Sequence, residues 1–384
     1  MSRKTLGVEK SLGNQQTCWP TIDRQSLILL LSLALFFISG KLGAQQIIPY
    51  DFDYRDSQNL IPVKVVIVTM FEIGQDEGDQ SGEFQLWKER QELDVRVAFP
   101  HSHHDLFYNP RTHVLGIVTG IGTAKSASAI MALGLDSRFD LSKSYWIIAG
   151  IAGIDPEDAS LGSAVWSSNL VDGDLAHEID SREIPDGWDF GYFPRYTNAP
   201  FDQKKPEPTG ELFVANESLR DWAFDQTKDM VLPDSSSLKE ARSLYTGHPN
   251  ALKPPFVLKG GHIAAMTFWH GEILNDWANR WVAYWTDNKT DFVTSAMEDT
   301  GTFQSLEYLD RINRVDKDRV MVLRAGSNYT MQPPGISAAE NLLKENKGFA
   351  GLNASFESLY IVGSKVLKEL LDNWEEYEET IPGS

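Results

Sequence analysis

Three segments of the chain place glycines and short polar side chains after runs of apolar residues. They are TGIGTAKSA at 119–127, YWIIAGIAGIDPEDASLGSAV at 145–165 and RAGSNY at 324–329. Glycine lets a ligand approach the backbone, and a helix that begins after such a turn presents N–H groups to an anion or a hydroxyl group. Ser327 and Asn328 can hydrogen-bond the edge of a heterocycle. These segments predict a small-molecule site, although a tight strand-to-helix turn alone would also account for 119–127.

The apolar runs before these segments are typical of strands buried on both faces of a sheet. Segments with helical periodicity lie between some of them. Such alternation predicts a layered α/β domain with helices on both faces and three strand ends meeting at one edge of the sheet. The expected strands are 63–69, 113–119, 145–150, 163–168 and 319–325, and the expected helices are 123–139, 295–312 and 355–376.

The chain divides into four parts by composition. Basic residues precede an apolar run within 1–44, which predicts a signal peptide, with an uncleaved membrane anchor as the alternative. A polar linker at 45–60 leads to one domain at 61–376, and 377–384 is a tail. An irregular region at about 178–260, rich in Pro, Asp and aromatic residues, is expected to be an insertion packed on that domain rather than a separate binding domain.

Charge and cysteine content exclude several classes of function. The formal net charge is −19, which argues against nucleic acid or anionic lipid as a partner. The only cysteine is Cys18, in the predicted signal peptide. A cleaved product would have no thiol, so disulfides, cysteine nucleophiles and cysteine-ligated metals are not expected. Apart from the N-terminal run, no segment is apolar enough to span a bilayer.

The sequence resembles the purine nucleoside permeases, a group within the nucleoside phosphorylase and nucleosidase superfamily. The motifs that carry the resemblance are VTGIGTAKSASAIMAL, KSYWIIAGIAGIDPEDASLGSAVWSSNLVDGDLAHEIDSREIP, TSAMED and VDKDRVMVLRAGSN, and it spans about 61–373. It implies a three-layer α/β/α sandwich around a mixed, partly closed sheet, with a nucleoside site at the strand ends. In such a site the glycines would let the backbone approach a ribose, a base or a phosphate, and those expected to line it are Gly120, Gly122, Gly150 and Gly153.

The resemblance also assigns roles to polar residues. Met297 and Glu298 match a Met-Glu pair whose carboxylate accepts hydrogen bonds from two ribose hydroxyls; without the resemblance, Glu298 would pass for a solvated residue in the first turn of a helix. Ser327 and Asn328 match the position that contacts the base. An Asp there protonates the purine, whereas Asn can only hydrogen-bond the leaving base, as in relatives that prefer oxopurines.

Two departures from the superfamily pattern concern catalysis. Phosphorolytic relatives carry Arg and Ser at positions that match Ile148 and Ile151, where a phosphate would find no charge. Hydrolytic relatives carry a run of glutamates whose last member activates water, and Gly74 occupies that place here. Glu72, or alternatively Glu77, is therefore our candidate for a substitute catalytic carboxylate.

Other clusters of reactive residues have simpler explanations. HSHHD at 101–105 has the composition of a metal site but no second group of ligands, so no metal is expected. His262 and His270 either pack beside tryptophans or contact a sugar or base. The acidic segment 172–180 suits acid–base chemistry or a surface loop. The aromatic segment 187–196 suits stacking on a purine, or a plug over the sheet edge.

The sequence thus predicts an exported protein, periplasmic or extracellular, that binds purine nucleosides and takes part in their uptake. The alternative is an N-glycosidic bond-cleaving enzyme, a nucleoside phosphorylase or hydrolase, with Asn328 and Glu72 as its catalytic residues. A scaffold without a ligand is a third hypothesis. No cofactor is expected, and phosphate would be a co-substrate only in phosphorolysis. A membrane partner would be needed for transport, and the superfamily suggests a homo-oligomer.

Overall fold

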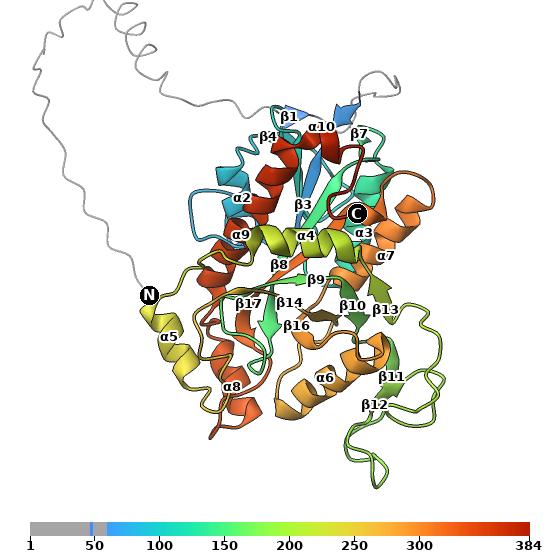
Figure 1. The fold of residues 1–384 in the computed structure, drawn as a ribbon, viewed down its shortest axis with the longest axis vertical. Helices are drawn as coiled ribbons and strands as arrows, with labels where there is room; N and C mark the ends of the chain where they lie inside the picture. Colours follow the sequence, from blue (N-terminus) through green and yellow to red (C-terminus); the bar gives the residue numbers. More distant parts are fainter. Residues whose placement is uncertain (1–46, 49–59) are drawn as a thin grey trace, which may run out of the picture. The chain divides into compact units, whose positions relative to one another are not determined.

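The computed structural model describes residues 47–48 and 60–384, so the predicted signal peptide and most of the linker lie outside the described residues. Within the described ranges, 13 strands form one mixed sheet (Figure 1). Three of these strands join it beside its main path: β17 (Val320–Tyr329) pairs with β8 and β9 (Ala164–Ser167), and β14 (Val257–Lys259) pairs with β9. Along the main path the order is β1 (Ile47–Ile48), β4 (Val95–Val97), β5 (Leu106–Asn109), β6 (Val114–Val118), β3 (Val65–Thr69), β8 (Tyr145–Ile154), β16 (Phe292–Ala296), β15 (Gly261–Ala264), β10 (Asn169–Asp172) and β13 (Leu212–Val214).

Strand β8 is the centre of this sheet because it has three partners. Its first half pairs in parallel with β3, from Tyr145 to Ile148. Its last residues pair in antiparallel fashion with β16 instead, through Gly153 and Ile154. Strand β17 accompanies β8 in parallel over nearly its whole length. The change of partner along one strand bends the sheet onto itself, which confirms the mixed, partly closed sheet expected from the resemblance.

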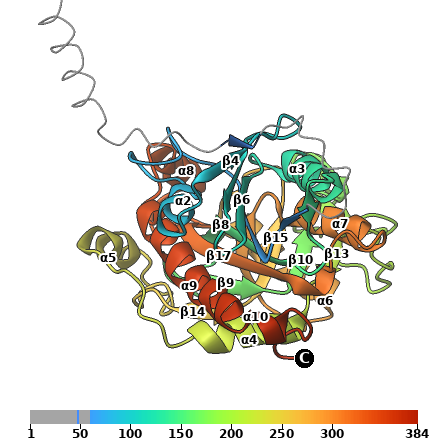
Figure 2. The same ribbon diagram turned by 90° about the horizontal axis from the view of Figure 1, so that it is seen from above.

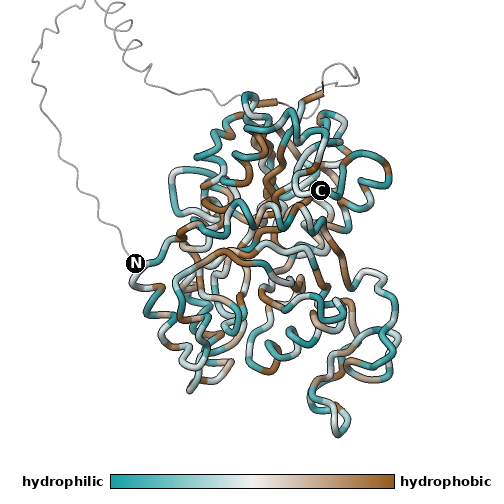
Figure 3. Tube along the Cα trace, viewed as in Figure 1, coloured by the Kyte–Doolittle hydropathy of each residue, from teal (hydrophilic) through white to brown (hydrophobic). Residues whose placement is uncertain are grey.

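Helices cover both faces of the sheet, as the alternation of apolar patterns predicts (Figure 2). Helices α3 (Thr123–Leu135) and α7 (Asp299–Asp310) bury Ile130, Leu133 and Leu306 against one face. On the other face lie α2 (Gln85–Arg90), α4 (Glu217–Thr227) and α9 (Leu352–Asp372), which packs Val362 and Val366 onto the strands. The most hydrophobic stretches of the chain therefore lie in the central strands, as Figure 3 shows.

A further helix, α6 (Glu272–Thr286), closes the lower part of the molecule in Figure 1. It packs Trp277, Trp281 and Trp285 around Phe292 and Ile263 of the sheet. Its first turn follows directly on the loop after β15, so α6 fixes the position of that loop. The remaining short elements are β2 (Ile61–Pro62), β7 (Phe139–Asp140), α5 (Ser236–Ser243), the 3-10 turn η1 (Lys317–Arg319), α8 (Ala338–Glu345) and α10 (Trp374–Tyr377).

Two of the three glycine segments differ from the prediction, because the strands do not end at their first glycines. Strand β8 continues through Gly150 and Gly153 to Ile154, and β17 continues through Gly326 to Tyr329. The pairing of β17 with β8 shifts register between Gly326 and Asn328. Such a bulge bends a strand and re-aims its side chains. The polar residues after Gly326 therefore lie on a bulged strand, and not in a turn.

The region expected as an irregular insertion contributes to the sheet. The region begins at the end of β11 (Ala176–Glu178), which pairs with β12 (Tyr192–Pro194) in a hairpin. This hairpin projects at the lower right of Figure 1. Further along, β13 pairs with β10, and β14 pairs with β9. Long loops join these pieces, so the region is irregular between its elements but is fastened to the same domain by strand pairing.

None of the helices in the described ranges combines the length and the apolar character needed to cross a membrane.

Candidate functional site

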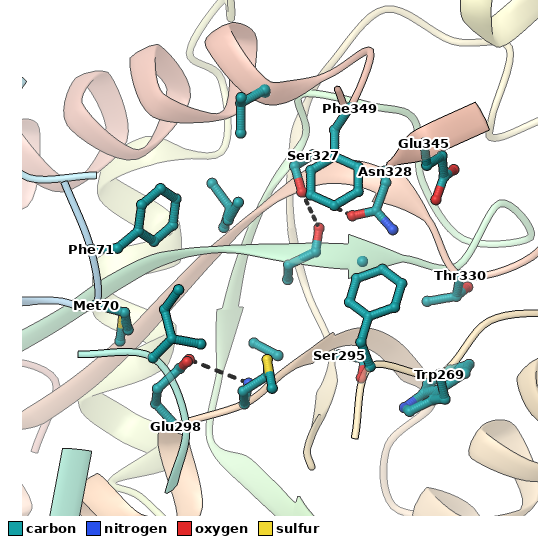
Figure 4. A pocket seen from close by; sticks show the side chains of 18 of the residues that line it. Met70, Phe71, Trp269, Ser295, Glu298, Ser327, Asn328, Thr330, Glu345 and Phe349 are labelled. Carbon is teal, nitrogen blue, oxygen red and sulfur yellow. Dashed lines mark hydrogen bonds between the residues drawn. The ribbon is translucent and has the colours of Figure 1, made fainter. Parts of the chain in front are cut away.

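A cavity of about 460 Å³ opens where β8, β16 and β17 come together, a volume that suits a small ligand. The strands line it with residues such as Gly153, Ser295 and Asn328, and the loop after β15 and the segment after α8 add Phe268 and Phe349, whose rings stack in parallel at 6.1 Å. In Figure 4, Glu298 and Met70 lie on one side of the space, with Glu345, Thr330 and Trp269 on the other. Ile121, after β6, lines the cavity as well, so the three glycine segments named in the sequence share one cavity.

Glu298 lies immediately before α7, at one end of the cavity, which we call the first end. Its side chain is buried, and the residue is 4% exposed. Its Oε1 accepts a hydrogen bond from the backbone N–H of Gly122 at 3.0 Å. Its Oε2 lies 3.2 Å from Nη2 of Arg324 and 3.3 Å from the N–H of Met297. A carboxylate has about four acceptor positions, so these three contacts leave one for a ligand hydroxyl, and a second hydroxyl would replace the long contact from Met297. Met297 lines the cavity beside it.

A buried charge network fixes the carboxylate of Glu298. Arg324, in the middle of β17, is completely buried and pairs with Asp299 at 2.6 Å as well as with Glu298. Asp299 also accepts a hydrogen bond from Nε2 of His262 at 2.8 Å, and Nδ1 of that ring meets Thr294. Burial opposes the charge of Asp299, but Arg324 and His262 outweigh burial and hold its pKa well below the usual range. Arg324 therefore holds the carboxylate of Glu298 in its position.

The glycines take different roles from the predicted one. Gly153 lines the cavity, but Gly120, Gly122 and Gly150 do not. A Cβ on Gly150 would lie 2.3 Å from Nη1 of Arg324, so this glycine makes room for the buried guanidinium group. Gly120 and Gly122 have φ of 86° and 99°, and the turn they form directs the Gly122 N–H at Glu298. We therefore correct their expected role from lining the pocket to supporting the network.

Ser327 and Asn328 lie on the bulge of β17, at the opposite end of the cavity from Glu298, which we call the second end. Both residues line the cavity. The hydroxyl group of Ser327 donates to Oδ1 of Asn328 at 2.9 Å, and Nδ2 of Asn328 donates to the carbonyl of Tyr329 at 3.2 Å. These bonds set the amide orientation and leave one N–H and one lone pair for a ligand. The amide is therefore preorganised to bind a polar edge.

Glu83 is a cavity residue that sequence reasoning missed. It precedes α2, is 3% exposed, and accepts backbone N–H bonds from Met70 and Ile151, both at 2.7 Å. Burial raises the pKa of Glu83 to about 8, although Arg324 opposes this shift. A carboxyl group with a pKa near neutrality can take up or release a proton during a reaction. No local motif distinguishes this glutamate from its acidic neighbours, and only the fold brings it to the cavity.

Glu72 and Glu77, our candidates for a catalytic carboxylate, do not line the cavity. Both oxygens of Glu72 are occupied by backbone N–H groups, including those of Phe84 at 2.9 Å and Gln85 at 2.5 Å. Glu72 therefore caps the turn before α2. The exposed side chain of Glu77 pairs with the buried Lys88. The prediction for Glu72 is corrected for this reason: Glu72 does not reach the cavity, whereas Glu83 does.

The other clusters named in the sequence lie away from the lining. His104 pairs with Asp76 at 2.9 Å, and no group of three or more metal-ligating residues comes together in the part of the chain that the structure describes. His262 belongs to the charge network. In the aromatic segment 187–196, Phe190 and Tyr192 pack with α6, as a plug would. Of the two positions that match the phosphate site of relatives, Ile148 is buried in the sheet, whereas Ile151 lines the cavity.

The family model and the similar sequences agree on one family. The family described as "Purine nucleoside permease (NUP)" matches residues 62–382. The chain therefore belongs to the purine nucleoside permease family. It is 26% identical to a probable purine nucleoside permease of Schizosaccharomyces pombe, over 89% of this chain and 99% of that protein. It is 28% identical to a purine nucleoside permease of Candida albicans, over 83% of this chain and 77% of that one.

Solved structures are similar at much lower identity. A 5'-methylthioadenosine/S-adenosylhomocysteine nucleosidase from Neisseria meningitidis, in complex with methylthio-immucillin-A, is 16% identical with a TM-score of 0.45, over 81% of this chain and 100% of that one. The futalosine hydrolase of Helicobacter pylori is 14% identical with a TM-score of 0.47, over 80% and 98%.

Proposed function

We propose that this protein binds purine nucleosides in the cavity, with the ribose hydroxyls on Glu298 and the base beside Asn328. The observation that supports this most strongly is the pairing of these two residues in one cavity, each held in place and each with unused hydrogen-bonding capacity. The intervening lining is largely apolar, including Ile151, Phe268 and Met297, which suits the faces of a planar base. The family name points to the same class of ligand.

The proposal includes export and a role in nucleoside uptake. The apolar N-terminal segment supports export, and the family name supports transport. In this role the protein captures a nucleoside outside the cell and delivers it to a membrane partner, while the segment is either removed or kept as a tether. Uptake of labelled inosine by cells that lack the gene, compared with the parent strain, tests this part. Equal uptake in both would contradict it.

A second candidate function is hydrolysis of the N-glycosidic bond, and the observation that favours it is Glu83. An ionised Glu83 would take a proton from a water molecule as the water oxygen bonds to C1′ of the ribose. The bond from C1′ to the base then breaks, Asn328 hydrogen-bonds the departing base, and the base takes up a proton from solvent. Of the described residues that line the cavity, none is Lys, Arg or His, so water suits this site better than phosphate as the nucleophile.

One experiment tests the binding proposal and separates it from hydrolysis. The purified protein is titrated calorimetrically with inosine, adenosine and uridine, with and without phosphate, while released base is measured by chromatography. Glu298→Ala should weaken inosine binding about 100-fold, because two hydrogen bonds to a charged acceptor are lost. Glu340→Ala is the matched control, since Glu340 is exposed on α8.

The outcomes separate the two functions. Binding without base release supports capture alone. Base release that needs no phosphate and is abolished by Glu83→Gln supports hydrolysis. No binding of any nucleoside by the intact protein would overturn both.

A further inference from the structure

The sequence contains four Asn-x-Ser/Thr motifs that the proposed function leaves unexplained. In a secreted protein this motif is the acceptor for N-linked oligosaccharide if the middle residue is not Pro, and it is expected in a surface loop. An oligosaccharide is bulky and hydrophilic, so the folded protein must present the asparagine amide to solvent. The structure therefore discriminates among the four asparagines, none of which is followed by Pro: Asn216, Asn288, Asn328 and Asn353.

Two of these asparagines are held against the protein. Asn328 is 5% exposed and lines the cavity, so a sugar on its amide would fill the space for a ligand. Asn216 caps α4: its Oδ1 accepts a hydrogen bond from the N–H of Leu219 at 3.1 Å, and its Nδ2 donates to the carbonyl of Asp318 at 3.0 Å. An oligosaccharide at either position would disturb contacts that the fold or the cavity needs.

The third asparagine, Asn353, is exposed but lies in a helix rather than in a loop. It is the second residue of α9. Ser355, the hydroxyl residue of its motif, is completely buried and donates to the carbonyl of Leu352 at 2.7 Å. Leu352 itself lines the cavity, so a sugar on the next residue would lie beside the cavity. Asn353 therefore lacks the loop setting of an acceptor.

Asn288 has the setting that the other three lack. It lies in the loop 287–291 between α6 and β16, and residues 287–289 are all exposed. Its backbone N–H donates to the carbonyl of Ala283 at 2.8 Å, whereas its side chain makes no hydrogen bond within the part of the chain that the structure describes. The backbone is therefore fixed at the end of α6, and the amide group extends into solvent.

The turn after α6 accounts for the asparagine of this motif but not for its threonine. Asp287 and Asn288 have φ of 56° and 58°, and asparagine is one of the few residues that adopt this left-handed conformation readily. The hydroxyl group of Thr290 has only a long contact, 3.5 Å to the carbonyl of Asp291. This hydroxyl group therefore contributes little to the fold, whereas the motif requires it.

The loop is far from the cavity along both elements that it joins. Helix α6 has 15 residues, a length of about 22 Å, and Trp269, which lines the cavity, precedes its first turn. Strand β16 begins after the loop at Phe292, and its cavity residues, Ser295 and Ala296, lie at its other end. An oligosaccharide on Asn288 would therefore leave the cavity open.

We propose that Asn288 is the N-glycosylation site of this protein and that the other three motifs are not modified. The inference rests on the proposed export, because the modification takes place in the secretory pathway. The co-reactant is a lipid-linked oligosaccharide pyrophosphate. A bond forms from Nδ2 of Asn288 to C1 of the first sugar as the bond from C1 to the pyrophosphate oxygen breaks. The amide nitrogen loses one proton, and the lipid pyrophosphate leaves with the electron pair.

The test uses the full chain produced in yeast, because two members of the family named above are yeast proteins. Peptide N-glycosidase converts each glycosylated Asn to Asp, and peptide mass spectrometry identifies the converted positions. We expect conversion at Asn288 and at none of the other three. Conversion at Asn216, Asn328 or Asn353 would overturn the selection by the fold. Secreted protein without conversion at Asn288 would overturn the inference itself.

Two substitutions of Thr290 assign the modification to the motif. Thr290→Val keeps the shape of the side chain but removes the hydroxyl group, so conversion at Asn288 should be lost. Thr290→Ser keeps the hydroxyl group and should retain the conversion. Both variants should bind inosine as the wild type does, since the loop is distant from the cavity. Conversion that persists in Thr290→Val would overturn the role of the motif.

A second version of the chain separates this inference from the proposed export. In it, a yeast secretion signal precedes the whole chain. Conversion at Asn288 in this version, with the unaltered chain retained in the cell and unmodified, would overturn export and support Asn288 as the acceptor. Secretion of both versions without conversion would overturn the inference and leave export intact.

Discussion

The two ends of the cavity differ in how their polar groups are satisfied. At the end of Glu298, protein partners already bind the charged groups: Arg324 lies between two carboxylates, and Asp299 also meets His262. At the end of Glu345, three buried polar atoms have no hydrogen-bond partner among the described residues: Oε2 of Glu345, Nε1 of Trp269 and Nδ1 of His270. The first end is therefore part of what holds the fold together, whereas the second keeps hydrogen-bonding capacity in reserve. Substitution of Arg324 should therefore lower stability more than substitution of Glu345, whose Oε2 has no protein partner among the described residues.

The strongest test of this difference is Arg324→Met. The substitution leaves the carboxylates of Glu298 and Asp299 buried without their common cation, so we expect the free energy of unfolding to fall by about 3–5 kcal/mol. Urea unfolding followed by tryptophan fluorescence measures the change. Arg182→Met is the control, because Arg182 pairs with Asp180 at the surface and should contribute little. A loss below about 1 kcal/mol for Arg324→Met would contradict a structural role for the network.

A smaller effect at the same end is expected from Gly150→Ala. The added Cβ would lie 2.3 Å from Nη1 of Arg324, so the guanidinium group must move away from its carboxylates. We expect a loss of about 1–3 kcal/mol in the same unfolding experiment. Gly153→Ala is the matched comparison on β8, since the atom nearest to its Cβ would be the methyl carbon of Thr330, at 3.1 Å. Equal stability for the two variants would mean that Gly150 is not required by Arg324.

The pH dependence of stability should reveal Glu83. Because its pKa in the folded protein is raised to about 8, the folded state holds a proton that the unfolded chain releases near the usual value of 4.5. Within that window the unfolding free energy must fall as pH rises. We expect the wild type to lose roughly 1–2 kcal/mol more than Glu83→Gln between pH 6 and pH 8. Parallel pH profiles for the two proteins would show that Glu83 is already ionised at pH 6.

The smallest effect, and the one that sharpens the contrast, is that of Glu345→Met on stability. The substitution removes the unpaired Oε2 but also Oε1, which accepts a hydrogen bond from Asn341 at 3.0 Å. These effects oppose each other, so the unfolding free energy should change by less than about 1 kcal/mol. The variant is compared with the wild type at pH 7 by urea unfolding in the absence of ligand. A loss of 2 kcal/mol or more would show that Glu345 supports the fold, as Arg324 does.

The sequence predicts the centre of the fold well, because continuous apolar runs identify buried strands. Strands β3, β6 and β8 all begin within two residues of their predicted positions. Strands β13, β14 and β16 were not predicted, since short strands amid polar residues lack a distinctive period. The lengths of β8 and β17 were underestimated because glycine was taken as a terminator, whereas Gly150 serves close packing inside a strand.

The candidate site was predictable only where a motif carried it. Glu298, Met297, Ser327 and Asn328 were named from short motifs, and the structure brings them to one cavity. Arg324 had a sequence signal that we did not use: a charged residue in a continuous buried strand requires a buried partner. Glu83 had no such sequence signal, because the acidic loop contains several equivalent glutamates. Only the tertiary structure shows which of them reaches the cavity.

The measurement that tests the account most directly is a crystal structure of the protein with inosine bound. The account predicts hydrogen bonds from both ribose hydroxyls to Glu298, with the base beside Asn328. Inosine bound outside this cavity, or inside it with the ribose at Glu345 and the base at Glu298, would contradict the central claim.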